Sequence, residues 1–253
     1  TRRLHEELGI DPSQISELKD SFHFIYRAEF DNGLTEHELD HVILGRFDGS
    51  VTLNTEEVEA VRDSVGVLDL PGFSRFNLSG EGAAEYLRGM ISGGLPKVGR
   101  MNLAYFPDSR GRILTEMSIM RHDEDFFTLI TAAVAQWHDF DVLNKNLPAG
   151  LTLTDHTDEY STLIVSGPKS RALFEAMGTE ADLTAGWLST QPAKVAGINC
   201  ALARVSFAGE LGWEIHAALA DIPALYDAVI AAGATPFGMY ALNAMRIEKG
   251  YRA

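Results

Sequence analysis

Alternating apolar and polar residues in the first part of the chain predict a β-hairpin. The aromatic-rich run Phe22–Phe30 and the run Glu36–Leu44, which alternates into an apolar end, are both typical of strands. Between them, Asp31-Asn-Gly33 supplies the residues that a tight hairpin turn requires. Charges along one side of Thr1–Leu8 predict a helix before the hairpin.

After about residue 63, strand and helix periodicities alternate along the chain. Strands are expected at Val65–Leu70, Arg75–Leu78, Asn102–Phe106, Ile113–Arg121, Phe126–Thr131, Ser161–Ser166, Ala201–Phe207 and Trp213–Ala217. Helices are expected at Glu81–Ile91, at Ala133–Asn146, from Gly167-Pro168 onward, and at Pro223–Ala232. The strands between Asn102 and Thr131 follow one another through short polar turns, which predicts a meander. The predicted class is α+β, mostly antiparallel.

Composition and charge indicate the expected cellular compartment and exclude two classes of partner. The 253 residues are 45% hydrophobic, which suffices for one large core or two smaller ones. The net charge of −15 repels phosphate backbones, so we expect no nucleic-acid partner. No apolar run approaches twenty residues, and the single Cys200 lies in an apolar stretch typical of a buried structural thiol. We therefore expect a cytoplasmic protein without a membrane partner.

Four motifs follow one another in the second part of the chain. They are Val65–Leu70, Gly111–Ser118, Arg204–Ile215 and Phe237–Arg252. In this order they resemble the glycine-cleavage T-protein superfamily, and the resemblance covers residues 63–253. The forms Gly-Glu-Leu-Gly-Trp-Glu and Arg-Ile-Glu-Lys-Gly-Tyr-Arg are most similar to the folate-binding domains of dimethylglycine and sarcosine dehydrogenases. The resemblance implies antiparallel-sheet lobes without the C-terminal β-barrel lobe that relatives carry next.

The resemblance also places a pterin-binding carboxylate at Glu210. A pterin edge offers paired N–H donors, and one fixed carboxylate can accept both. Taken without the resemblance, Glu210 would be a polar residue of a hairpin turn. Arg204, Trp213 and Tyr240 lie in the matched segments and could form a cation site and an aromatic wall against the folate rings, or could serve packing.

A catalytic carboxylate is expected at Glu116. The superfamily carries an acidic residue here, near the folate nitrogen that receives the one-carbon unit, and Glu116 is the only carboxylate in that neighbourhood. T-proteins proper have Asp-Asp where this chain has Thr115-Glu116, so the chain departs from the amine-cleaving pattern. The alternative is a solvent-facing strand residue. Arg246 and Glu248, which alternate along one segment, are expected to form a structural ion pair.

The first 62 residues resemble a different family. Arg2–Ile10 is similar to the end of a Nudix box, and Tyr26–Ala28 with Asp31–Val42 is similar to type I isopentenyl-diphosphate isomerase. This resemblance places Mg²⁺- or Mn²⁺-binding acids at Glu6, Glu7, Glu36 and Glu38. The family's upstream cysteine and histidines are absent, so a partial Nudix-like α/β/α piece without isomerase activity is expected.

Two families joined at residues 62 and 63 without a linker predict a chimera that arose during sequence assembly or cloning, with natural fusion as the alternative. The larger part implies transfer of a one-carbon unit from an N-methyl amine, or its oxidation product, to tetrahydrofolate. No flavin or nucleotide fingerprint occurs, so FAD would belong to another domain or to a flavin dehydrogenase partner. The alternatives are a non-catalytic folate-binding module and a remnant isomerase.

Overall fold

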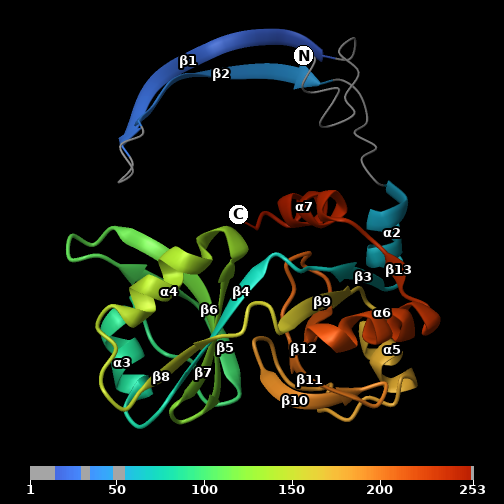
Figure 1. The fold of residues 1–253 in the computed structure, drawn as a ribbon. Coiled ribbons are helices and arrows are strands. Elements are labelled where there is room, and N and C mark those ends of the chain that lie inside the picture. The colour runs from blue at the N-terminus through green and yellow to red at the C-terminus, as the bar shows by residue number, and fades with distance from the viewer. Residues whose placement is uncertain (1–14, 30–34, 48–54, 252–253) are drawn as a thin grey trace. The chain divides into compact units, whose positions relative to one another are not determined.

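A computed structural model describes residues 15–29, 35–47 and 55–251 (Figure 1). Contacts divide the chain into two compact units, Thr1–Asn54 and Thr55–Ala253, which are described separately. In the first, β1 (Ile15–Glu29) pairs antiparallel with β2 (Thr35–Phe47). The predicted hairpin is therefore confirmed, although its turn lies outside the described residues. The compact unit begins eight residues before the expected boundary at residues 62 and 63, which stays a prediction.

Of the four metal-binding glutamates expected in the first unit, two lie outside the residues that the structure describes. The helix predicted at Thr1–Leu8, with Glu6 and Glu7, lies outside the described residues. Glu36 and Glu38 lie on β2, where their backbones pair with Ala28 and Tyr26 of β1. A Nudix-like piece is not shown by this hairpin.

A five-stranded antiparallel sheet forms one half of the second unit. Its strand order is β5-β6-β7-β4-β8. The bounds are β4 (Phe73–Ser79), β5 (Arg100–Pro107), β6 (Ile113–Asp123), β7 (Phe126–Ala132) and β8 (Thr152–Asp155). The predicted meander is confirmed, because β5, β6 and β7 pair in sequence order.

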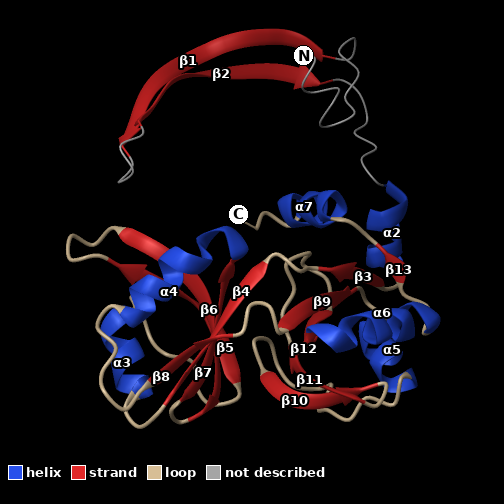
Figure 2. Ribbon diagram, viewed as in Figure 1, coloured by secondary structure: helices blue, strands red, loops and turns tan. Residues whose placement is uncertain are grey.

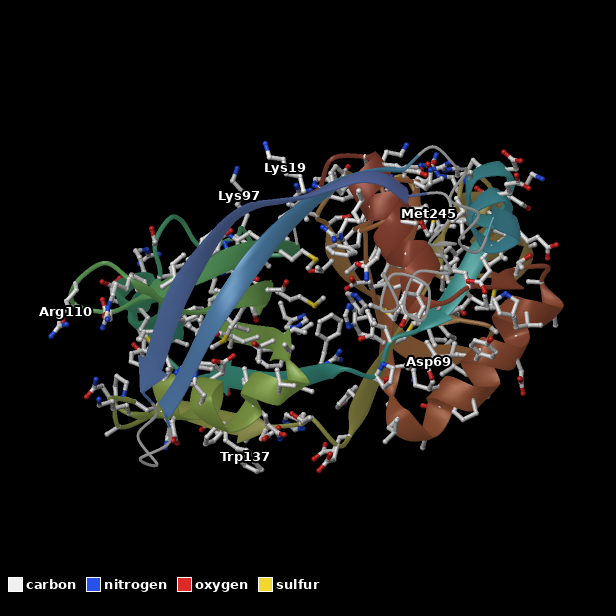
Figure 3. All side chains as sticks on the ribbon, turned by 90° about the horizontal axis from the view of Figure 1, so that it is seen from above. Lys19, Asp69, Lys97, Arg110, Trp137 and Met245 are labelled. Atoms are coloured by element: carbon white, nitrogen blue, oxygen red, sulfur yellow. The ribbon has the colours of Figure 1, made fainter. Side chains whose placement is uncertain are left out.

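Helices cover one face of this sheet (Figure 2). Alternate residues such as Phe76 and Leu129 pack with Leu87 of α3 (Ala83–Met90) and Leu143 of α4 (Gln136–Asn144). A short 3₁₀ turn, η2 (Ala133–Ala135), leads into α4. Trp137 projects outward from α4 and is 74% exposed (Figure 3).

A six-stranded sheet forms the other half, in the order β10-β11-β12-β9-β3-β13. Its strands are β3 (Gly66–Asp69), β9 (Tyr160–Ser166), β10 (Thr190–Val195), β11 (Ile198–Ala203), β12 (Gly212–Ala218) and β13 (Thr235–Pro236). Only β13 pairs in parallel, with β3. Trp213 and Ile215 pack with the outer helices α5 (Ser170–Ala176) and α6 (Ile222–Ala231), the latter preceded by η3 (Leu219–Asp221).

The faces without helices meet each other. Met101, Met120 and Ile130 of the five-stranded sheet pack against Ala203 of the six-stranded sheet. One β-bridge, between Arg100 and Ser189, also joins the halves. Successive side chains along each strand therefore point alternately toward the helices and toward the other sheet.

The ends of the second unit pack together. Val58 and Val61 of α2 (Thr55–Asp63) contact a cluster that includes Leu242 and Met245 of α7 (Met239–Glu248). The Gly238 backbone N–H donates to Glu57 Oε2 at 2.7 Å. Residues 55–62 are thus part of the same core as the C-terminal helix.

Several expected elements differ in detail. The predicted strand Ala201–Phe207 ends at Ala203, because the Arg204 backbone bonds with Leu188 and Ser189 instead of β12. Helix α5 begins at Ser170, beyond Pro168. Five helices and strands were not predicted, namely α2, β8, β10, β13 and α7. Strand β10 contains Pro192, and in a sequence pattern a proline indicates the end of a strand. An edge strand tolerates it, because its outer side forms no hydrogen bonds to a neighbouring strand.

Substitution of Gly167 tests how closely the end of α2 packs against the residue that follows β9. Its φ is +135°, and an added Cβ would approach Ser64 O, Val61 O and Val65 Cα closer than 3.0 Å. We expect Gly167→Ala to lower the free energy of unfolding by about 2–5 kcal/mol, because backbone overlap adds to left-handed strain. Chemical denaturation measures this. Gly178→Ala, with φ +66° and no atom within 4 Å, should cost only about 1–2 kcal/mol. Equal losses would contradict the steric argument.

Candidate functional site

Two of the predicted residues, Arg204 and Glu210, line one cavity of about 330 Å³, which we call the Glu210 cavity. Its other lining residues are Trp187, Ser206, Gly209, Leu211 and Tyr251. The connection between β11 and β12 supplies most of this wall. Ser206 is buried, and its Oγ has no hydrogen-bond partner in the described part of the chain.

Glu210 is held by a lysine that the sequence analysis missed. Lys249 Nζ lies 3.0 Å from Glu210 Oε1, and the two side chains are 41% and 20% exposed. A Cβ on Gly209 would approach Lys249 Cγ closer than 3.0 Å, so the lysine chain rests on a position that only glycine allows. The Arg-Ile-Glu-Lys motif was the available signal for Lys249.

Arg204 stands between the cavity and the core. Its Nη1 donates to the Gly212 carbonyl at 3.1 Å, and its Cζ lies 4.8 Å from the centre of the Trp213 ring. Burial, and then the charge of Arg171, lower the pKa of Arg204. Trp213 is only 1% exposed and packs edge-to-face on Phe174. Trp213 therefore supports Arg204 from the core and does not itself line the cavity.

The other predicted residues lie outside the Glu210 cavity. Tyr240 is 67% exposed on α7. Glu116 is exposed on β6 of the five-stranded sheet, opposite Tyr105, and no side-chain bond engages it among the described residues. The structure thus brings together Glu210 and Arg204, with Trp213 behind them, and leaves Tyr240 and Glu116 elsewhere.

The expected ion pair between Arg246 and Glu248 is wrong. Glu248 pairs with Arg62 of α2 instead, and Arg246 donates to the Tyr251 carbonyl at 2.9 Å. The segment is the helix α7, in which residues two apart do not face each other. The prediction assumed the alternation of a strand.

A second cavity, of about 430 Å³, opens between the facing surfaces of the two sheets, and we call it the inter-sheet cavity. Arg75 of β4 reaches across the gap. Its Nη2 donates to Thr162 Oγ1 at 3.1 Å and to His216 Nδ1 at 2.8 Å. Since the guanidinium can only donate, Nδ1 must be the unprotonated nitrogen and Nε2 carries the proton. His216 Nε2 lies 3.1 Å from Glu214 Oε2.

Burial sets the charge state of this polar network. Desolvation lowers the pKa of Arg75 to about 10, with Glu214 and Tyr160 opposing the shift. Desolvation also lowers the pKa of His216, while Glu214 raises it less. The pKa of His122 is lowered by burial and by the nearby His216 and Arg75. At neutral pH the network holds a charged Arg75 and neutral histidines.

Cys200 lines the same inter-sheet cavity. The side chain is half-buried, and desolvation raises its pKa to about 11. This agrees with a packing role for the thiol, because a nucleophile needs a lowered pKa.

The described residues contain no group of three His, Cys, Asp or Glu side chains placed to hold a metal ion. None of the helices among them is long and apolar enough to cross a bilayer.

The family model of the GCVT N-terminal domain matches residues 36–253. Dimethylglycine dehydrogenase from Rattus norvegicus is 33% identical over 206 residues, which cover 78% of this chain and 24% of that protein. An aminomethyltransferase from Deinococcus deserti is 29% identical over 203 residues, covering 77% of this chain and 56% of that protein. The chain thus spans about a quarter and about half of these relatives.

The crystal structure of glycine cleavage system aminomethyltransferase T from Bartonella henselae matches with a TM-score of 0.70 and 19% identity, covering 99% of this chain and 62% of that chain. This similarity confirms the mixed α+β class with antiparallel sheets. The resemblance of residues 1–62 to isopentenyl-diphosphate isomerase is not supported, since the family match begins at residue 36. The metal-binding roles of Glu6, Glu7, Glu36 and Glu38 depended on that resemblance.

The inter-sheet network predicts a stability that depends on pH. The folded pKa of His216 lies below its unfolded value of about 6.5, so the unfolded chain binds more protons as the pH falls through that value. We expect the free energy of unfolding in urea to decrease from pH 7.5 to pH 5.5, and His122 to add to this loss. His216→Asn should flatten the pH dependence. Val229→Ala, which opens a cavity in the core without removing a titrating group, should lower stability but keep the slope.

Proposed function

The chain belongs to the aminomethyltransferase family defined by the GCVT N-terminal domain. On that premise we propose that the Glu210 cavity binds tetrahydrofolate. The domain would pass to it a one-carbon unit from an N-methyl amine or its oxidation product. Family membership implies use of tetrahydrofolate, and the single observation that carries the assignment to this cavity is the half-buried carboxylate of Glu210 beside Arg204.

The residues of the Glu210 cavity fit a pterin. A volume of about 330 Å³ lies within the range of small-molecule pockets. Lys249 contacts Glu210 Oε1, so the carboxylate is oriented and can accept further N–H bonds. Ser206 Oγ is buried without a partner among the described residues, and Trp187 offers a half-exposed ring as a stacking surface.

Each polar residue has a distinct part in this proposal. Glu210 would accept the paired N–H groups of the pterin, while Lys249 fixes the carboxylate and offsets its charge. Arg204, held by the Gly212 carbonyl and the Trp213 ring, would provide a fixed cation in the cavity wall. Bound tetrahydrofolate would supply the nucleophilic nitrogen that accepts the one-carbon unit. Glu116 would hold or move the proton of that nitrogen.

Oxidation of an N-methyl amine would belong to a flavin-containing domain or partner. This part of the proposal follows from the similarity to dimethylglycine dehydrogenase, of which the chain spans about a quarter. FAD would be bound there and not by the residues of the Glu210 cavity. The methyl donor would reach this domain already oxidised.

A non-catalytic folate-binding module is the second candidate. It is favoured by one observation, namely that Glu116 does not line the cavity that contains Glu210. Binding without acceleration of transfer would distinguish it from an aminomethyltransferase.

Calorimetric titration of the 253-residue chain with tetrahydrofolate tests the folate site. We expect Glu210→Gln to weaken binding roughly tenfold to hundredfold, because it removes charge-assisted hydrogen bonds. Glu180→Gln is the matched control, since Glu180 pairs with Lys194 at 3.7 Å but lies outside the cavity. Equal affinities for the parent and Glu210→Gln would refute the assignment.

Glu116→Gln separates binding from catalysis. We expect its affinity for tetrahydrofolate to stay within about threefold of the parent, while the rate of one-carbon transfer from formaldehyde, above the spontaneous rate, falls roughly a hundredfold or more. Stopped-flow absorbance measures this rate. Parent protein that binds tetrahydrofolate without any acceleration would establish the folate-binding module instead.

A further inference from the structure

The inter-sheet cavity has no part in the proposed folate chemistry. Strand β6 carries both Glu116 and His122, and six strand residues span about 20 Å. Met120 lies between them and is buried in the apolar layer that joins the two sheets. His216 likewise lies six residues after Glu210, and the lining residues of the two cavities do not overlap. The inter-sheet cavity is therefore a separate space.

Arg75 is a buried cation on the wall of this cavity. It is 6% exposed, and both partners of its Nη2, Thr162 and His216, are neutral groups. Glu214 lies 3.1 Å from His216 Nε2 and forms no ion pair with Arg75 among the described residues, and its charge offsets only part of the desolvation of Arg75. Arg75 Nε has no hydrogen-bond partner among the described residues. A buried charge in this condition is costly unless an anion comes close to it.

The five-stranded sheet presents further hydrogen-bonding groups beside Arg75. Thr128 Oγ1 donates to Asn77 Oδ1 at 2.8 Å and lies 2.8 Å from His122 Nε2. With Nε2 engaged, His122 Nδ1 remains available among the described residues. Phe126 packs on the His122 ring with a centroid distance of 5.0 Å.

Two half-exposed aromatic rings complete the lining. Phe126 of β7 is 38% exposed and Tyr160 of β9 is 41% exposed, and each comes from a different sheet. The Tyr160 ring also lies 5.6 Å from Arg75 Cζ. An apolar body placed in this cavity could contact both rings while its polar end faces Arg75.

We propose that the inter-sheet cavity binds a small monocarboxylate with an apolar or aromatic body, its carboxylate directed to Arg75 and its body held by Phe126 and Tyr160. The cavity volume of about 430 Å³ lies within the range of small-molecule pockets, which suits a ligand of that size. A dianion such as phosphate is disfavoured by Glu214, by Asp221 on the lining, and by the net charge of −15.

Calorimetric titration of the full chain measures occupancy of the inter-sheet cavity. Benzoate is the probe, and benzamide is its uncharged match. We expect benzoate to bind with a saturable heat, and benzamide to have less than one tenth of its affinity. Benzamide binding as strongly as benzoate, or no binding of benzoate, would overturn the proposal.

Substitutions of cavity residues test where benzoate binds. We expect Phe126→Ala and Arg75→Gln each to weaken benzoate binding at least tenfold, while the exposed Ile113→Ala, outside the cavity, leaves it unchanged. Phe126→Ala removes a half-exposed ring, so it tests the cavity even if Arg75→Gln fails to fold. Glu210→Gln should leave benzoate binding intact, which separates this site from the folate site. Unchanged affinity in a folded Phe126→Ala protein would refute the proposed position.

Discussion

The guanidinium of Arg75 crosses from β4 of one sheet to Thr162 and His216 of the other. Each sheet has its own helical cover and its own apolar core. Backbone bonds also join the halves, since the Met101 N–H donates to the Leu188 carbonyl and the Thr190 N–H donates to the Gly99 carbonyl. The small apolar cluster around Met120 adds contact area. Hydrogen bonds from a planar, permanently charged group impose an angle as well as a distance. The facing surfaces, and the cavity between them, therefore depend on this side chain together with those backbone bonds.

The polar groups of the second unit are arranged at opposite ends of the same strands. Strand β12 begins beside Glu210 and continues to His216, and β6 begins near Glu116 and continues to His122. The apolar layer between these ends keeps the two sets of charges apart. A fold of two facing sheets thus has room for a site at each end, each built from residues of ordinary strands.

Much of the fold was predictable because local patterns were strong. The meander from β5 to β7 and the two hairpins, β1–β2 and β11–β12, combine alternating residues with turn residues. Strand β10 was missed because Pro192 imitates a loop, and only its place at the sheet edge makes the proline acceptable. Helix α7 was missed because its apolar residues pack against α2, a partner that no local pattern reveals.

The sites were predictable only in part, for the same reason. Glu210 and Arg204 lie close in sequence and share a cavity. Lys249 follows Glu210 by 39 residues, and their contact requires α7 to be placed first. Assigning a strand period to a helix produced the wrong partner for Glu248. The Arg75 network joins three strands whose residues are individually unremarkable, so the sequence carried no signal for it.

The contact between α2 and α7 can form only after both helices have been synthesised. Glu57 bonds to Gly238, 181 residues later, and Val61 packs with Leu242 and Met245. Loop closure over such a distance is slow and cannot precede synthesis of α7. Until then α2 lacks the cover of α7, and Glu210 has no lysine beside it. The nascent domain would thus carry exposed apolar surface until α7 has been made, a state that favours chaperone binding.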